Sequence, residues 1–176
     1  NLAKVLSIVF LLLVASQVYS KGVQQSYKIL VISVKGNKSA DATIQKAATL
    51  LEVGRVDEAQ KLLAGQSSGL AYALSSVINV ALNNVDQALA DGRKAVEMSP
   101  SPASSIALSY AQQAALNLEG AQATMQSANT DHGNNALVLA RLSELNLMLG
   151  DRKTALELAN QAAAANAELD HPQVVL

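Results

Sequence analysis

The chain has 176 residues, of which 50% are hydrophobic and none is cysteine. This length is sufficient for one domain with a hydrophobic core or for a short array of stacked units. The lack of cysteine excludes disulfide frameworks, thiolate nucleophiles and cysteine-based metal sites. Because only 3% of the residues are aromatic, the core must consist of alanine, leucine and valine, which favours closely packed helices.

Charge is distributed unevenly along the chain. The first forty residues contain five lysines and no acidic residue, whereas the whole chain has a formal net charge of −1, so the remainder carries six net negative charges. A nucleic-acid-binding protein would carry its basic residues on the folded body. The pattern therefore argues against a nucleic-acid partner.

Residues 1–20 have the composition of a signal peptide or a membrane anchor. An eleven-residue apolar stretch, VLSIVFLLLVA, follows Lys4, and VYS at 18–20 offers the residues that a signal peptidase recognises. The stretch is short for a membrane span, which needs about 20 residues, and the lysines that follow it oppose export under the positive-inside rule. A cleaved peptide would make the protein periplasmic and a retained one would anchor it to a membrane; a soluble, packed helix is the third alternative.

Residues 21–40 form a basic linker that contains a strand-like segment. YKILVISVK at 27–35 is rich in β-branched residues, and glycines flank it. An isolated strand has no partner for its backbone hydrogen bonds. This segment therefore belongs to a β-domain outside the chain, continues a helix, or lies against the body as an extended peptide.

The body, residues 41–170, contains an internal repeat. LLEVGRVDEAQKLL at 50–63 and LMLGDRKTALELA at 147–159 place leucine, glycine and alanine in the same order. Alignment on the alanine after each turn gives intervals of 29, 33 and 34 residues, and a second small residue lies twelve positions before each alanine. Small residues at two fixed points allow the two helices of a hairpin to touch. The four pairs are Ala47 and Ala59, Ser76 and Ala88, Ser109 and Ala121, and Ser143 and Ala155.

With this period, and with segments such as RKAVEMSP and ARLSELNLMLGDRKTALELANQA, the chain resembles a tetratricopeptide repeat (TPR) protein over about residues 40–170. SPASSIALSYAQQAALNLEGA is similar to bacterial TPR proteins that carry an envelope-associated N-terminal domain. The resemblance implies an all-α fold, a right-handed α-solenoid of about four TPR-like hairpins preceded by the apolar N-terminal segment. An alanine-rich helical bundle with coincidental repetition is the alternative. The expected helices are 42–53, 56–65, 70–82, 85–98, 103–116, 119–128, 135–149 and 152–167, with left-handed glycines at Gly54 and Gly150 and the start of a further helix at 171–176.

In TPR proteins the first helix of each hairpin lines the concave side, so the resemblance implies a binding groove there. The groove is mainly apolar and lacks the Lys/Asn/Arg cluster with which some TPR modules clamp a C-terminal carboxylate. We therefore expect an extended apolar ligand, either a partner's helix or the protein's own leader. The alternative is that these positions are core, covered by the next helix. The implied partner-binding residues are Ile44, Leu51, Leu70, Val77, Val80, Ile106, Tyr110, Gln113, Leu137, Glu144 and Leu147, with Ala48, Ala73 and Ala140 between them.

The sequence offers little catalytic chemistry. His132 and His171 lie far apart without metal-ligand spacing, and no phosphate-binding glycine loop or GxSxG motif occurs. We therefore expect no enzymatic activity, cofactor or metal. The predicted function is a scaffold that binds a protein or peptide in the assembly of a cell-envelope complex. The alternative is a self-assembling structural subunit, an oligomer or filament whose leader or terminal helix docks into a neighbouring solenoid; an enzyme accessory domain is the third.

Overall fold

The computed structural model describes residues 30–31, 34–35 and 40–170, with side chains up to residue 165. The expectations for residues 1–20 and for a helix starting at 171–176 concern residues outside these ranges. All eight expected helices are present, and their ends lie within three residues of the predicted ones. They are α2 (Ala42–Glu52), α3 (Val56–Leu63), α4 (Gly69–Ala81), α5 (Val85–Met98), α6 (Pro102–Ala114), α7 (Leu118–Asp131), α8 (Ala136–Met148) and α9 (Arg152–Asp170).

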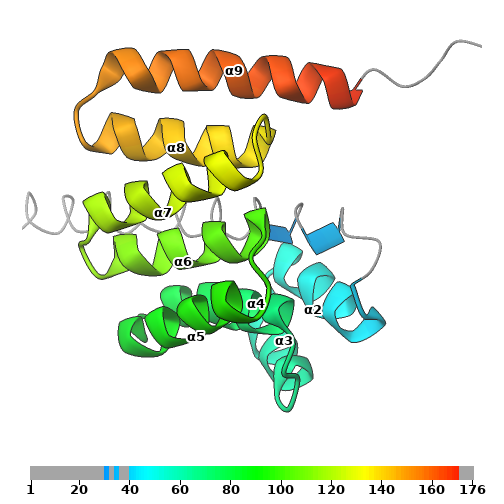
Figure 1. Cartoon of the computed structure of the whole chain (residues 1–176). Helices are drawn as coiled ribbons and strands as arrows, with labels where there is room; N and C mark the ends of the chain where they lie inside the picture. Colours follow the sequence, from blue (N-terminus) through cyan, green and yellow to red (C-terminus); the bar gives the residue numbers. More distant parts are fainter. Residues whose placement is uncertain (1–29, 32–33, 36–39, 171–176) are drawn as a thin grey trace, which may run out of the picture.

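The helices form four hairpins that stack in chain order (Figure 1). Within the hairpins, α2 packs on α3, α4 on α5, α6 on α7 and α8 on α9. Between hairpins, the first helices contact one another in the order α2, α4, α6, α8, and each second helix contacts the first helix of the next hairpin. Each hairpin thus buries its open face on its neighbour, which is the packing of an α-solenoid. The predicted all-α solenoid is confirmed.

The small residues lie where the two helices of each hairpin meet. Ala59, Ala88 and Ala121 are fully buried, and Ala155 is 4% exposed. In the second hairpin the Ser76 hydroxyl donates a hydrogen bond of 2.8 Å to the Ala88 carbonyl. The fourth hairpin repeats this bond between Ser143 and Ala155 at 2.6 Å. The predicted twelve-residue register is therefore confirmed.

The turn within each hairpin has the same backbone geometry in all four units. A residue with positive φ follows the first helix: Gly54 at 78°, Asn83 at 59°, Leu116 at 60° and Gly150 at 90°. The amide of this residue donates to the carbonyl three residues earlier, and the next amide donates to the carbonyl five residues earlier, at 2.8 to 3.1 Å. These paired bonds define a Schellman motif and satisfy the last carbonyls of the helix. The predicted left-handed conformation of Gly54 and Gly150 is confirmed.

Side-chain caps determine where the first helices begin. Asp41, Ser68, Ser101 and Asn135 precede α2, α4, α6 and α8, and each side chain accepts a hydrogen bond from a backbone amide of the first turn. Those amides have no partner within the helix, so each cap stabilises a helix start.

The described part of residues 27–35 is helical, and the strand-like prediction is wrong there. Leu30, Val31, Val34 and Lys35 adopt helical backbone conformation, and they lie beside α2 in dark blue in Figure 1. The three apolar side chains are 1%, 1% and 0% exposed. β-propensity reflects how well a side chain packs on a half-buried surface. Here the described valines are buried among helices, and the four described residues agree with the alternative that the segment continues a helix.

Candidate functional site

The predicted groove residues lie on the first helices, α2, α4, α6 and α8; we call the surface that carries them the groove face. Leu70, Gln113, Leu137 and Glu144 are half-buried, and Leu147 is 58% exposed. The other six have at most 7% of their surface exposed, so the prediction of an open apolar groove is wrong for them. Their role in partner binding stays a prediction. These six are Ile44, Leu51, Val77, Val80, Ile106 and Tyr110.

Three of the six are covered by helices of their own and neighbouring hairpins. Ile106 and Tyr110 belong to a cluster that includes Met125 of α7 and Leu142 of α8. Val80 packs with alanines of α5 and α6. These positions are therefore core, as the alternative interpretation of the sequence stated.

The other three belong to the hydrophobic cluster that also contains buried residues of the N-terminal segment. Ile44 and Leu51 of α2 and Val77 of α4 share one hydrophobic cluster with Leu30, Val31 and Val34. Fully buried alanines of the same cluster, Ala48 and Ala73, lie between them. Alanines allow a helix to approach closely. Leu30, Val31 and Val34, which have helical backbone, are therefore buried in one cluster with groove-face residues of the first two hairpins.

Two polar contacts join Val34 and Lys35 to α2. We call the described residues Leu30, Val31, Val34 and Lys35 the docked segment. The Gln45 side-chain amide donates a hydrogen bond of 3.2 Å to the Val34 carbonyl. Lys35 forms an ion pair with Glu52, the last residue of α2, where the helix dipole also favours a cation. Both charged side chains are partly exposed, at 39% and 50%. The segment is thus held by an apolar stripe and by one charge at its end.

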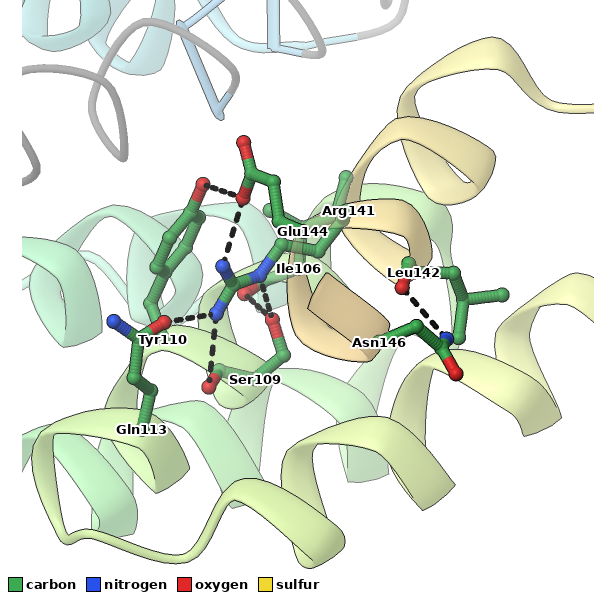
Figure 2. Close-up of polar contacts among 8 residues, drawn as sticks. All are labelled: Ile106, Ser109, Tyr110, Gln113, Arg141, Leu142, Glu144 and Asn146. Atoms are coloured by element: carbon green, nitrogen blue, oxygen red, sulfur yellow. Dashed lines mark hydrogen bonds and ion pairs between the residues drawn. The ribbon is translucent and has the colours of Figure 1, made fainter. Parts of the chain in front are cut away.

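A buried arginine organises the groove face of the last two hairpins (Figure 2). Arg141 is 1% exposed. Its Nε donates to the Ser109 hydroxyl at 3.0 Å, one terminal nitrogen donates to Glu144 at 2.9 Å, and the other donates to the Gln113 side chain at 2.7 Å. The guanidinium also lies over the Tyr110 ring, 3.6 Å from its centroid. A buried charge is tolerated when it is paired and hydrogen-bonded in this way.

These bonds fix the orientation of Glu144 on the groove face. The carboxylate oxygen that accepts from Arg141 also lies 3.4 Å from the Tyr110 hydroxyl, and the Glu144 side chain is 35% exposed. Gln113, Tyr110 and Glu144 were predicted groove residues, and the structure brings them together. They form a polar site, which differs from the apolar one expected.

The role of Arg141 was not predicted from the sequence, although comparison of the repeat units indicates it. In the repeat register, the positions equivalent to Arg141 in the second and third hairpins are Leu74 and Ala107, and both are fully buried. An arginine at a position that is apolar in two of the other hairpins indicates a buried polar network. The equivalent residue in the first hairpin is Gln45, which binds the docked segment.

In the described part of the chain, two carboxyl groups have a lowered pKa, and helix capping explains both. Hydrogen bonds from Thr43 lower the pKa of the Asp41 carboxyl, and hydrogen bonds from Thr154 lower the pKa of Asp151. Among the described residues, no three His, Cys, Asp or Glu side chains are grouped to hold a metal ion. No helix in the described ranges is sufficiently long and apolar to span a membrane.

Comparison with known proteins supports the fold. No family model and no curated protein matches the chain. Several solved structures are similar. One is "MamA RS-1 ArsTM double mutant", which has 16% sequence identity and a TM-score of 0.58; the match covers 90% of this chain and 94% of the other. "MamA MSR-1 C2" has 19% identity and a TM-score of 0.54, covering 88% and 98%, and "Crystal structure of MamA" has 12% and 0.58, covering 83% and 88%. At these identities the likeness shows an all-helical solenoid of the TPR type.

Proposed function

We propose that this chain is a non-enzymatic scaffold that binds a helical segment of a partner protein on the groove face of its solenoid. One observation supports this most directly: Leu30, Val31 and Val34 are buried in one cluster with groove-face residues of the first two hairpins, and Val34 and Lys35 bind side chains of α2. A surface that buries one such segment has the shape and chemistry to bind another. Recognition of an amphipathic helix by an apolar groove is a common mode of peptide binding.

Site-specific photo-crosslinking tests this proposal at two matched leucines. Leu147 lies on the groove face and is 58% exposed, and Leu156 lies on α9 and is 64% exposed. Replacement of Leu147 by benzoylphenylalanine should give a cross-linked product with a discrete partner in an extract of the source cells. The same replacement at Leu156 should not. The partner, once identified by mass spectrometry, is purified and its binding is measured directly.

The proposal fails if position 147 gives no product, or if both positions give the same products. The first result would mean that the groove face contacts no partner, and the second that capture depends only on an exposed apolar position.

Self-assembly is the second candidate function, and it is favoured because the segment on the groove face belongs to this chain. Every copy carries the same segment, so a neighbour's residues 30–35 could make the same contacts and join copies into an oligomer or filament. Because the chain has no cysteine, the double variant Lys35→Cys, Glu52→Cys carries only this pair of thiols. Oxidation followed by non-reducing electrophoresis should give a ladder of multimers if copies exchange segments. Monomers alone would contradict this candidate.

For localisation we propose the cell envelope. The support is the composition of residues 1–20, a basic residue followed by an apolar stretch. Cell fractionation of the tagged full-length protein tests it, and recovery only in the cytosolic fraction would overturn it.

A further inference from the structure

The docked segment indicates what kind of helix the groove face selects. Leu30, Val31 and Val34 have helical backbone, and the sequence spaces them at i, i+1 and i+4, a spacing that faces one side of a helix. All three are buried in one hydrophobic cluster with aliphatic side chains and alanines of α2 and α4. These surroundings accept leucine- or valine-sized residues. A charged side chain would lose its hydration there without gaining a partner.

The polar contacts add direction and charge to this selection. The Val34 carbonyl is bonded to Gln45, and Lys35, at position i+5, is paired with Glu52. A helix bound in the opposite direction would not present its cation to Glu52 after the apolar residues. The Glu52 carboxylate at the end of α2 therefore selects for a positive charge on the ligand and for one direction of the ligand helix.

We infer that the groove face of the first two hairpins recognises helices with three aliphatic residues at i, i+1 and i+4 and a lysine or arginine at i+5, and that residues 30–35 compete for this site from within the chain. The inference rests on the proposed function and names the chemistry of its ligand. Because a tethered segment has an effective concentration on the order of mM, it excludes weaker external ligands. A partner binds by matching the same motif when the segment is displaced.

The test uses the full 176-residue chain and a fluorescein-labelled peptide of residues 27–38. The variant Leu30→Asp, Val34→Asp, called the opened chain, should release the segment and bind the peptide, measured by fluorescence anisotropy. The wild-type chain should bind it at least about tenfold more weakly, since its own segment competes. A peptide with Val34→Asp should not bind the opened chain.

Charge exchange tests the role of Glu52. In the opened chain, Glu52→Lys should weaken binding of the peptide about three- to tenfold at low ionic strength, and a peptide with Lys35→Glu should restore it. Glu97→Lys, the same charge change at an exposed position of α5, is the matched control and should have no effect. Equal effects of the two charge changes, or no rescue by the exchanged peptide, would overturn the assignment of Glu52.

Failure of the opened chain to bind the peptide, with helix content and unfolding temperature preserved, would overturn the motif itself. Photo-crosslinking at position 147 would still report whether the groove face binds a partner, so the two failures are distinguishable. If the opened chain does not fold, amide hydrogen exchange of residues 30–35 replaces it. In the otherwise wild-type chain, Glu52→Lys should accelerate this exchange and Glu97→Lys should not; equal rates would contradict the inference.

Discussion

The guanidinium of Arg141 lies 3.6 Å from the centroid of the Tyr110 ring and joins α8 to α6 inside the solenoid. Tyr110 is 5% exposed and Arg141 is 1% exposed, so the stack is shielded from water. A cation over an aromatic face gains about 2 kcal/mol when it is desolvated. The pair therefore connects the third and fourth hairpins through more than apolar contact.

Removal of this arginine should destabilise the protein. Arg141→Ala leaves the Ser109, Gln113 and Glu144 acceptors without their donor, and loss of one partner of a buried pair costs about 3 to 5 kcal/mol. Because Glu144 is 35% exposed and water can solvate it, we expect about 2 to 3 kcal/mol. Equilibrium unfolding in urea measures the change.

Two further substitutions give this prediction its controls. Arg141→Lys keeps the charge but not the planar fork of donors, and it should lose about 1 to 2 kcal/mol. Arg152→Ala, at an exposed position of α9, should change stability by less than about 0.5 kcal/mol. Equal effects of Arg141→Ala and Arg152→Ala would show that the buried network contributes nothing.

Overpacking tests the contact within the hairpins. Ala88→Leu or Ala121→Leu places a larger side chain at a fully buried position, and such insertions cost about 1 to 3 kcal/mol. Ala163→Leu lies on the exposed side of α9 and should have little effect. Thermal unfolding of the three variants provides the comparison, and three equal curves would contradict the repeat register.

Leu116 is a site where a substitution should stabilise the protein. It has φ of 60° and is 90% exposed, whereas Gly54 and Gly150 occupy the equivalent turns. Left-handed backbone costs a residue with a Cβ about 1 to 2 kcal/mol, so Leu116→Gly should raise the free energy of unfolding by about 1 kcal/mol. Ala115→Gly, at a φ of −81°, should lower it. A loss of stability with Leu116→Gly would contradict the interpretation of the turn.

The Asp151 cap should make stability depend on acid pH. Hydrogen bonds from Thr154 hold the pKa of its carboxyl below the ordinary value, which is about 3.9 in unfolded chains. Its stabilising contribution is therefore complete above the unfolded pKa and is lost as the pH falls through the lowered pKa of the folded state. Asp151→Asn keeps a capping oxygen but does not titrate. The advantage of the wild-type protein in unfolding temperature should vanish in acid, and a constant difference from about pH 2 to 7 would contradict a titrating cap.

The hairpins could be predicted because their signals are local. Small residues twelve positions apart, a glycine or asparagine at three of the four turns, and capping side chains before the first helices each act within a few residues. Leu116 shows that the turn geometry also forms without its usual residue. Its position was fixed by the repeat, since the alanine five residues later is in register.

The groove face could not be predicted in the same way because exposure depends on what covers a residue. Leu51 and Val80 have the same place in the repeat as the exposed Leu147, but Leu51 is buried in the cluster that contains Val34, and Val80 is buried with alanines of α5 and α6. Arg141 illustrates the opposite error, because arginine is rarely buried and its partners Ser109, Tyr110 and Gln113 come from another hairpin. Both outcomes are decided by tertiary contacts, which composition and spacing do not contain.

The docked segment also has a consequence for synthesis on the ribosome. Most contacts of the solenoid join helices that are adjacent in the chain, so each hairpin can fold soon after it is made. Leu30, Val31 and Val34, in contrast, share their cluster with Ala73 and Val77 of α4, which are translated more than one hairpin later. The three apolar residues of the docked segment are therefore synthesised before the α4 residues of their cluster. During that interval they are available to a chaperone or to a neighbouring nascent chain.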